Sequence, residues 1–440
     1  MLKKIYNTIF IVLFLAVLAV PLALTRWESG GVSEDENRTL AAFPEVTVEG
    51  QWNEKFTSQF ETWFMDHMGL RSELIAANAT LQYKGFDRLL SNSNYHIGPY
   101  GDLNYADEEM IKDYAHANLR TDYWVSQIGN AYQVTADYLA QRDVPFFYIQ
   151  CYDKHSIYPE QFTTAVKQIG TVSKTDQIIT YLQESTSVNV IDLKPALLAG
   201  KEQYEVYSNW GDPTHWSERG AHIGYLHIME QLQAELGVEL KVLQEEDYTI
   251  TVEDGGKTIN NVLHEEDLLE VFTIRDPQAQ VQDNAVMGSW QDRDHTVLKN
   301  PNAGNDLKLL LLCDSYFNSY LLDDFAESFS EVWLIWADYM IDLPEILEIY
   351  DADLVILENA ERVDRSGQMR NLEIKLRNLK GWQLEQGKWY YYQQGSKHFG
   401  WLQEGDNWYY LDPQMVTGTV TIDGKTYEFN GSGVCLNPND

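Results

Sequence analysis

Asp212 and His215 form a pair whose residue types and spacing can support catalysis. They lie three residues apart in the segment WGDPTHWSERGA, residues 210–221. On a loop, this spacing lets the carboxylate accept a hydrogen bond from one imidazole nitrogen, which fixes the tautomer of the ring. The other ring nitrogen can then act as a general base, so the pair predicts a base that requires a nucleophile to activate.

Ser315 is the candidate nucleophile. It lies in the segment LLLLCDSYFNSYLL, directly after the most apolar run of the α/β-like region and at the expected start of a helix. A serine in this place is exposed at a sheet edge, and helix N-terminal amides can stabilise an oxyanion beside it. The residues predict a Ser-His-Asp triad in the chain order Asp212, His215, Ser315, because geometry rather than order defines a triad.

Each signal also has a simpler interpretation. An Asp-x-x-His pair occurs often by chance and can cap a surface turn, and a serine after a strand is commonly an N-cap. Cys313 is a rival nucleophile, although a small buried thiol is expected there, and Asp314 is expected to order the turn. Metal binding by Asp212, His215 and His222 lacks a recognisable ligand spacing, so no metal and no cofactor are predicted.

Short apolar runs alternating with helix-like segments must position these side chains. This alternation predicts an α/β fold, a mostly parallel sheet with flanking helices, in which ligands bind at the carboxyl ends of the strands. A helix is expected from about Ser217 to Gly237. Residues 238–300 are acidic and turn-rich and predict an insertion or a small β subdomain. The expected strands are residues 144–150, 188–193, 307–312, 332–336 and 354–357.

Residues 5–24 predict a membrane-spanning helix, because they carry no charge and would cross about 30 Å of hydrocarbon. Lys3 and Lys4 precede this stretch and would stay in the cytoplasm, which places the body of the chain outside the cell. A cleaved signal peptide is the alternative, although no clean small-residue cleavage site follows. Either outcome predicts an exported protein. An aromatic stripe at helical spacing within residues 51–90 predicts core packing.

The composition restricts the classes of function. The 440 residues carry a formal net charge of −35, which argues against binding of nucleic acid or anionic lipid through bulk electrostatics. The hydrophobic share of 44% suffices for a sizeable packed core, and the length favours two or three domains. Three cysteines do not describe a disulfide scaffold, and sequence alone gives no support for a bridge between Cys151 and Cys313.

The C-terminal part of the chain contains an internal repeat of 19 residues. Trp382 and Trp401 are separated by this interval, as are Trp389 and Trp408, and Tyr427 follows after the same interval again. The repeat predicts a short solenoid of β-hairpins, because a single hairpin cannot bury its own aromatic face.

Seven segments occur in the order typical of one family, and the chain resembles that family from about residue 34 to 365. It is the DHHW family, whose relatives include the alginate O-acetylation proteins of the SGNH hydrolase superfamily. No single segment is specific, but seven in order are. The segments are EDENRTLAAFPEV, FETWFMDHMGLRSELI, NYHIGPYGDLNY, YDKHSIYPE, DPTHWSERGA, LLLLCDSYFNSYL and DADLVILENAER.

The resemblance implies an SGNH hydrolase-like, flavodoxin-like domain with Ser315 as nucleophile, His215 as base and Asp212 as its orienting acid. It also implies the late serine, which ordinary SGNH hydrolases place early. Two positions depart from the pattern: Cys313 replaces the glycine before Asp-Ser, and Pro213 stands where alginate-type relatives often have aspartate. Candidate substrate contacts, of which the aromatic ones have core packing as the alternative, are Trp216, Tyr316, Tyr320 and Lys154.

The repeats resemble the cell-wall-binding repeats of choline-binding and glucan-binding surface proteins. In choline binders, aromatic side chains of successive repeats surround a quaternary ammonium through cation–π attraction. The alternative is that the aromatics only stack to hold the solenoid together. Two full repeats allow at most one or two sites, so affinity without avidity is expected to be low. The candidate ligand residues are Trp382, Trp389, Tyr390, Trp401, Trp408 and Tyr409.

The leading interpretation is an extracytoplasmic O-acyltransferase that moves an acetyl group to an envelope polysaccharide through an acyl-serine. The resemblance implies a membrane-bound O-acyltransferase as partner. A carbohydrate esterase would use the same triad with water as acceptor, and separation of Ser315 from His215 would favour a non-catalytic, wall-anchored scaffold. The expected layout is a membrane anchor or signal sequence at 1–25, a linker at 26–50, a catalytic domain at 51–375 and wall-binding repeats at 381–436.

Overall fold

The chain forms two compact units in the computed structural model. The first comprises Met1–Ile97 and Gly256–Glu266, and the second Gly98–Gly255 and Asp267–Asp440. The predicted catalytic domain therefore draws on both units, since its residues 51–97 belong to the first. The structure describes residues 2–27, 31–33, 38–48, 50–86, 88–89, 94–259, 263–283, 295–385 and 387–438.

Some predicted segments fall partly outside the described residues. In the linker these are residues 28–30, 34–37 and 49, of which 34–37 also belong to the first family segment. In the catalytic domain they are residues 87, 90–93, 260–262 and 284–294, the last two ranges within the predicted insertion, and in the repeats residue 386.

The predicted apolar N-terminal helix is confirmed as α1 (Leu2–Ala23). Its residues Ile5–Ala23 have a mean hydropathy of 2.4 and are almost entirely exposed. Within the described part of the chain it is the one helix long and apolar enough to cross a membrane. By length and composition it fits a membrane span or a signal sequence equally.

An aromatic cluster packs the rest of the first unit. Trp63 on α2 (Phe56–His67) is fully buried, and its ring centroid lies 4.8 Å from Phe43 and 5.6 Å from Phe60. This packing agrees with the core role predicted for the aromatic stripe. The remaining elements of this unit are α3 (Arg71–Phe86), β1 (Val32–Ser33), β2 (Arg38–Thr39), β3 (Thr47–Val48), β4 (Gln51–Trp52) and β5 (Tyr95–Ile97).

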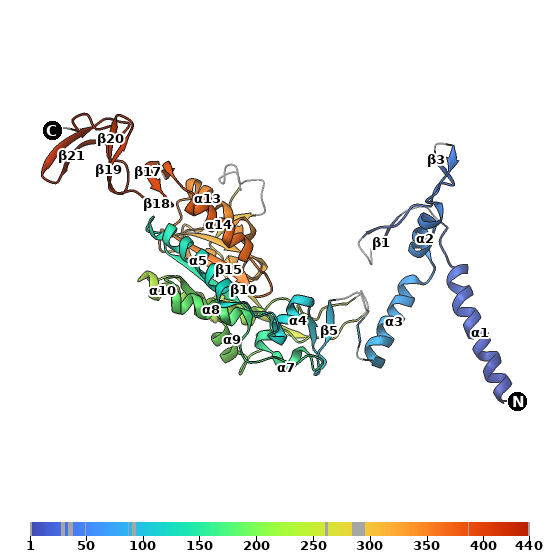
Figure 1. The fold of residues 1–440 in the computed structure, drawn as a ribbon. Helices are drawn as coiled ribbons and strands as arrows, with labels where there is room; N and C mark the ends of the chain where they lie inside the picture. The colour runs from blue at the N-terminus through green and yellow to red at the C-terminus, as the bar shows by residue number, and fades with distance from the viewer. Residues whose placement is uncertain are drawn as a thin grey trace. The chain divides into compact units, whose positions relative to one another are not determined.

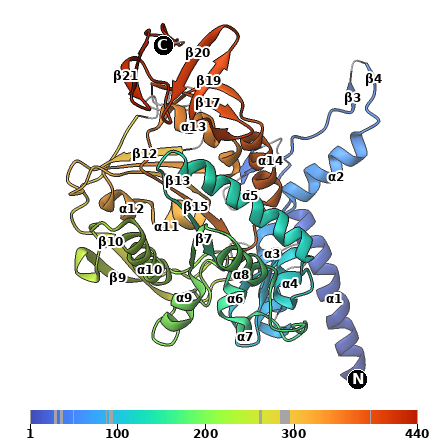
Figure 2. The same cartoon turned by 60° about the vertical axis from the view of Figure 1, so that its left-hand side comes forward.

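A seven-stranded sheet forms the centre of the second unit (Figure 2). All five predicted strands are present and pair in parallel, so the expected α/β fold is confirmed. Two antiparallel strands, β11 and β12, extend one edge. In spatial order the strands are β11 (Gln280–Val281), β12 (His295–Lys299), β14 (Glu331–Trp336), β13 (Lys308–Cys313), β15 (Leu354–Ala360), β7 (Phe146–Cys151) and β8 (Asn189–Asp192).

The order of the parallel strands is a circular permutation of the flavodoxin-like sheet. When β13 is counted as the first strand, the order β14-β13-β15-β7-β8 becomes 2-1-3-4-5, which is the flavodoxin-like order. The first strand of this sheet in the sequence, β7, therefore has the fourth position in the flavodoxin-like numbering. The strand that carries the serine therefore comes late in the sequence, which accounts for the reversed order of the candidate triad.

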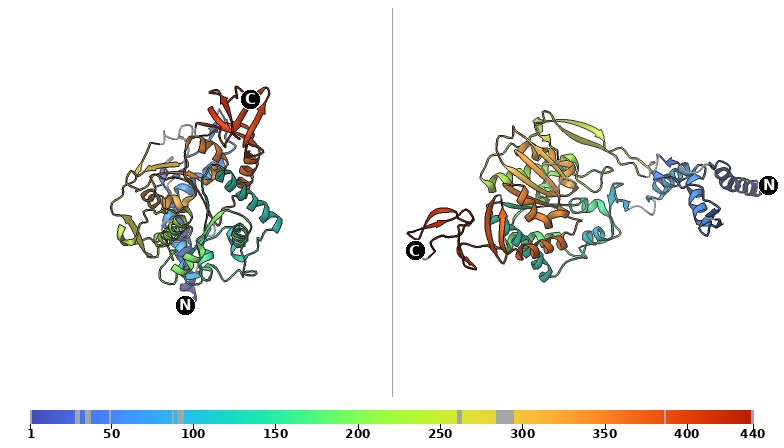
Figure 3. Two further views of the ribbon diagram at one scale, coloured as in Figure 1. Left: turned by 90° about the vertical axis from the view of Figure 1, so that its left-hand side faces the viewer. Right: turned by 90° about the horizontal axis from the view of Figure 1, so that it is seen from above.

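Two layers of helices cover the sheet, one on each face (Figures 2 and 3). Successive residues of the strands point to opposite faces, so Leu309 and Leu311 join one apolar cluster while Leu310 and Leu312 join the other. The first cluster includes α9 (Lys194–Gly200), α10 (Glu218–Leu236), α11 (Ser315–Tyr320) and α12 (Leu322–Ser328); the second includes α5 (Asp122–Ala140), α8 (Lys174–Ser185), α13 (Leu343–Ile349) and α14 (Ser366–Arg377).

The predicted insertion at 238–300 divides between two structures. Its first part forms the hairpin of β9 (Tyr248–Asp254) and β10 (Leu268–Ile274), which packs on α10. Its last part supplies β11 and β12 to the edge of the main sheet. Short elements complete this body: α4 (Glu108–Ala115), α6 (Lys154–Ile157), α7 (Pro159–Phe162), β6 (Leu103–Tyr105), η1 (Glu245–Asp247) and η3 (Ala337–Asp342).

Successive β-hairpins follow α14, as the repeat predicts (Figure 1). The third hairpin is offset by 18 residues rather than 19, because Tyr427 pairs with Val420 as Tyr409 pairs with Leu402. Tyr427 thus occupies the place of Tyr409, not that of Trp408. The strands are β16 (Gly381–Glu385), β17 (Lys388–Gln393), β18 (Ser396–Lys397), β19 (Gly400–Glu404), β20 (Asn407–Leu411), β21 (Gly418–Ile422) and β22 (Lys425–Phe429).

Candidate active site

The structure brings Asp212, His215 and Ser315 into one hydrogen-bonded chain. His215 Nδ1 lies 2.8 Å from Asp212 Oδ2, and His215 Nε2 lies 2.7 Å from Ser315 Oγ. Because the carboxylate can only accept, Nδ1 carries the proton and Nε2 is left to accept from the serine hydroxyl. The side chain of His215 is 14% exposed and that of Asp212 is 39% exposed, so solvent reaches the group.

Hydrogen bonds keep Asp212 ionised. Its Oδ1 accepts from the Thr214 amide at 2.8 Å and from the Thr214 hydroxyl at 2.6 Å, while Oδ2 faces His215. Burial opposes ionisation, but the hydrogen bonds from His215 and Thr214 outweigh it and hold the pKa of Asp212 below its usual range. The carboxylate therefore remains available to orient the imidazole.

Ser315 lies where strand order reverses in the sheet. It is the first residue of α11 and follows β13, whose neighbours β14 and β15 run out to either side. Ligands of doubly wound sheets bind at this switch point. Asp314 caps the turn as expected: its Oδ1 accepts from the Tyr316 amide at 3.1 Å. That amide is thus engaged and does not serve as the oxyanion donor expected from the helix terminus.

A buried carboxyl on β15 supports the serine turn. Glu358 Oε2 accepts from the Asp314 amide at 2.9 Å, and Asp314 Oδ2 accepts from the Ala360 amide at 3.0 Å. Glu358 is fully buried, and burial together with the neighbouring charge of Asp314 raises its pKa well above the ordinary range. Burial therefore favours the protonated form of Glu358, and the turn is bound to β15 through the carboxyl groups of both Glu358 and Asp314.

The loop that carries Asp212 is held from two sides. Asp267 Oδ2 accepts from the amides of Trp210 and Gly211, at 2.8 and 3.0 Å. After His215 the chain enters α10, whose N-cap Ser217 accepts from the Gly220 amide at 3.1 Å. Gly220 is required by packing, because a Cβ atom there would overlap the carbonyl oxygen of Val206.

Arg362 connects the base loop to the sheet. Its guanidinium donates to the Thr214 carbonyl at 2.7 Å, pairs with Asp153 and lies over the ring of Tyr316. Together with Glu358 and Glu361, it belongs to the ENAER end of a family segment. The sequence alone assigns no role to these residues, because their partners lie far away along the chain.

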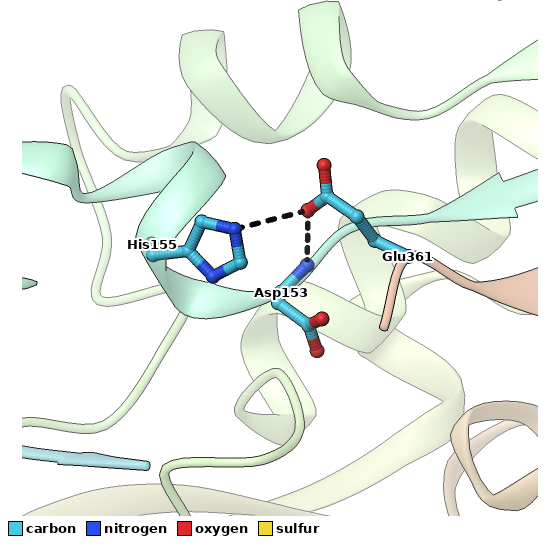
Figure 4. A group of neighbouring side chains, drawn as sticks. All are labelled: Asp153, His155 and Glu361. Carbon is cyan, nitrogen blue, oxygen red and sulfur yellow. Dashed lines mark hydrogen bonds and ion pairs between the residues drawn. The ribbon is translucent and has the colours of Figure 1, made fainter. Parts of the chain in front are cut away.

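Glu361, His155 and Asp153 form a buried cluster beneath this connection (Figure 4). Their ligand atoms lie within 4.8 Å of one another, which is compatible with a metal ion. However, Figure 4 shows the Asp153 carboxylate turned away from the other two, and it engages Arg362 and the Tyr316 hydroxyl. Glu361 in turn accepts from the Asp153 amide at 3.0 Å. We interpret the cluster as structural support for the loop after β7.

Three of the four predicted substrate contacts lie in the interior. Trp216 is 1% exposed and Tyr316 is fully buried, so neither presents a ring face to a sugar. Lys154 is 2% exposed and donates to the Leu103 carbonyl at 2.9 Å; burial lowers its pKa to about 8. Tyr320 alone is partly exposed, with its ring centroid 5.6 Å from that of His215.

The structure favours neither of the two alternatives weighed beside Ser315, a cysteine nucleophile and a metal site that includes His222. Cys313 and Cys151 are free and fully buried, and burial raises the pKa of both thiols. A thiol in that state is a poor nucleophile. His222 hydrogen-bonds neither Asp212 nor His215 among the described residues, and lines a separate cavity.

The aromatic residues of the hairpins pack mainly on one another. Trp382 lies 4.8 Å from Tyr409 of the next hairpin, and Trp401 lies 4.8 Å from Tyr427, centroid to centroid. These contacts hold successive hairpins together. One face of Tyr390 is occupied by the ammonium of Lys397, 3.7 Å from the ring centroid.

The two remaining candidates for wall-ligand binding differ in exposure. Trp408 packs against the cluster of the last hairpin, where its ring centroid lies 6.2 Å from that of Trp401. Trp389 is 42% exposed. Of the six predicted residues, Trp389 therefore presents the most accessible aromatic surface to a ligand.

Two family models match parts of the chain. Residues 125–297 match the SGNH hydrolase-like domain of the acetyltransferase AlgX, and residues 400–414 match a cell wall binding repeat. The resemblances read from the sequence are thereby confirmed for these segments. The first match contains Asp212 and His215 and ends before Ser315. No curated protein matches the chain.

Solved structures resemble parts of the chain. Bacillus cereus PatB1 is 17% identical, covering 57% of this chain and 93% of its own, with a TM-score of 0.43. A DHHW family protein from Eubacterium siraeum is 15% identical, covering 56% and 88%, with a TM-score of 0.40. The choline binding domain of Spr1274 from Streptococcus pneumoniae is 36% identical, covering 14% and 89%, with a TM-score of 0.13.

Proposed function

We propose that this chain, which carries an SGNH hydrolase-like domain of the AlgX type and cell wall binding repeats, is an extracytoplasmic O-acetyltransferase. Its substrate would be a polysaccharide of the cell envelope. The observation that carries the proposal is the unbroken contact from Asp212 through His215 to Ser315. A scaffold protein has no need for that contact, whereas an acyl-serine enzyme requires it.

The proposed reaction has two transfers through one serine. Ser315 Oγ attacks the acyl carbon of the donor while His215 Nε2 takes its proton, and that proton then leaves with the departing group of the donor. A sugar hydroxyl next gives its proton to Nε2 and attacks the acetyl-serine. The new sugar ester departs, and the proton returns to Ser315. Asp212 stabilises the imidazolium in both steps.

The terminal segments support a location between membrane and wall. Residues 1–25 would anchor the chain, residues 26–50 would connect to the catalytic part within 51–375, and hairpins 381–436 would bind the wall. We propose choline or a glycan as the ligand of the hairpins. A membrane-bound O-acyltransferase would supply the acyl group on the outer face.

Hydrolysis is the competing outcome, and one observation favours it. Ser315 is partly exposed, so water can approach the same acyl-serine. An esterase and a transferase would then share the first step and differ only in the second. The fate of the acyl group therefore decides between them.

Intact-mass analysis of the full chain in detergent micelles tests the proposal, with p-nitrophenyl acetate as donor. We expect one acetyl adduct, absent from Ser315→Ala and retained in Ser126→Ala, a serine variant on the separate helix α5. Faster discharge in the presence of a cell-wall glycan selects the transferase, and discharge that ignores the glycan selects the esterase. A folded chain that forms no adduct and turns over no ester contradicts both.

A further inference from the structure

A cavity of about 450 Å³ adjoins the candidate triad. Its size lies in the range of small-molecule sites, roughly 300–1,000 Å³. It is bordered by the first turns of α10, by the end of α11 and by β10. The lining residues that matter here are Glu218, His222, Phe272, Tyr320, Asp323 and Asp324.

Tyr320 connects the cavity to the base. Its ring lies 5.6 Å from that of His215, centroid to centroid, and it also lines the cavity. Two of the helices that border the cavity begin directly beside the triad, since α11 starts at Ser315 and α10 starts three residues after His215. A molecule in the cavity that contacts the ring of Tyr320 is therefore separated from His215 by that ring.

His222 gives the cavity a polar group without a partner. It is 5% exposed, and within the described part of the chain neither ring nitrogen has a hydrogen-bond partner. Burial lowers its pKa to about 4, so the ring is neutral and offers one donor and one acceptor. Buried polar groups are almost always paired, which makes an unpaired imidazole in a cavity wall an indication of a ligand.

The charges of the wall define what kind of ligand fits. Glu218, Asp323, Asp324 and Glu327 line the cavity, and no lysine or arginine is among the lining residues that the structure describes. Glu327 is paired with Lys241, at 2.8 Å, from outside the cavity. Arg219, whose charge acts on His222, is already paired with Glu245 and Glu270. An anionic ligand would therefore meet carboxylates and compete with them for this cation, which is unfavourable. Sugar hydroxyls, in contrast, can donate to carboxylates and exchange hydrogen bonds with an imidazole.

We propose that this cavity binds the acyl-accepting sugar unit and that it selects uncharged hexose-based glycans over uronate-type anionic ones. Phe272 and Tyr320 supply apolar ring surface for the sugar, and His222 bonds a hydroxyl while another hydroxyl is directed toward Ser315. The inference rests on the proposed function for its role in transfer, but binding of the glycan does not depend on catalysis.

The first test measures binding without chemistry. Full-length Ser315→Ala protein in detergent micelles is titrated with N-acetylglucosamine pentamer and, separately, with mannuronate pentamer. Saturation-transfer NMR measures the binding in each titration. We expect the neutral pentamer to bind at least ten-fold more tightly, and His222→Phe in the same background to weaken it about ten-fold. His227→Phe is the matched control, on the same helix but outside the cavity.

The second test measures transfer and keeps the inference falsifiable if His222→Phe misfolds. Asp323→Lys changes an exposed residue at the rim, and we expect it to shift the transfer preference several-fold toward the mannuronate pentamer. Equal binding of both pentamers, or no effect of either variant, overturns the inference. Slower acetylation of Ser315 with unchanged glycan binding would assign the cavity to the donor and overturn it as well. Wild-type protein that binds the neutral glycan but forms no acetyl-serine contradicts the proposed function alone.

Discussion

The guanidinium of Arg362 donates a hydrogen bond to the carbonyl oxygen of Thr214, one residue before His215. The same guanidinium pairs with the buried carboxylate of Asp153. The candidate base loop is thus held by a residue that follows β15, the strand that pairs directly with the serine strand β13. We therefore propose that Arg362 is a positioning residue for the imidazole of His215.

Arg362→Lys should slow acetylation of Ser315 about ten-fold, because a lysine cannot bond Thr214 and Asp153 with one planar group. The charge pair with Asp153 is retained, so unfolding should change little. Arg362→Met should slow acetylation further and should also destabilise the fold, since an unpaired buried carboxylate costs about 3–5 kcal/mol. Acetylation rates by intact mass, with thermal unfolding alongside, check the order. Equal rates in wild type and Arg362→Lys would remove its positioning role.

Asp212→Asn should preserve the fold and reduce acetylation by roughly three to four orders of magnitude. The amide can donate to His215 Nδ1, which would place the proton on Nε2 and leave no base for Ser315. Steady-state ester turnover and adduct formation measure the loss. A variant that keeps more than a tenth of the wild-type rate would show that Asp212 does not orient the base.

Glu358→Gln should leave the free energy of unfolding nearly unchanged, whereas Glu358→Ala should lower it. Burial favours the protonated form of Glu358, so an amide of the same shape still accepts from the Asp314 amide. Alanine would leave that buried amide unpaired, at about 1–3 kcal/mol. Denaturant unfolding of the two variants gives the comparison. Strong destabilisation by glutamine would mean that the carboxyl is ionised.

The stability of the second unit should fall as pH rises from 5 toward 7, in part through Asp324. Burial raises its pKa to about 7, against about 3.9 when unfolded. Between these values the folded state holds a proton that the unfolded state has lost, so the unfolding free energy decreases with pH and levels off above 7. Thermal unfolding at pH 5 and pH 8 should show a smaller difference for Asp324→Asn. Asp323→Asn, at the exposed neighbour, should keep the wild-type difference.

Trp401→Ala should loosen the terminal hairpins, because its ring packs on Tyr410, Tyr427 and Phe429. We expect a local loss of about 2–3 kcal/mol and faster proteolysis after α14. Trp389→Ala removes a ring that is 42% exposed and should leave the hairpins intact. Retention on choline-agarose then separates the roles: a loss with Trp389→Ala at unchanged proteolysis would mark a ligand contact.

Local patterns predicted most of what is local in the structure. The strands, the helix after Ser217 and the hairpins follow from apolar periodicity and caps, which act over a few residues. The spacing of Asp212 and His215 also sufficed to place one beside the other. Their contact with Ser315 could be proposed because both lie at the carboxyl ends of parallel strands.

Long-range contacts could not be predicted in the same way. Glu358, Arg362 and Asp267 support the site through partners that are distant in sequence, and a single sequence contains no signal that pairs them. For the same reason the sequence leaves core packing open as the alternative for Trp216 and Tyr316, and it gives no sign that Lys154 is buried. Residue type alone does not say which side of a loop faces the interior. The addition of β12 to the main sheet could not be predicted either, because β12 pairs with β14, which is distant in the sequence.

The permuted strand order has a consequence for the synthesis and folding of the protein. A chain is synthesised from its N-terminus, so β7 and β8 emerge long before β13, β14 and β15 exist. The edge of β7 that will pair with β15 stays open until residue 360 has emerged, and contacts of such long range form slowly. The candidate base is therefore synthesised before the candidate nucleophile, and we expect no nascent chain that ends before residue 360 to become acylated.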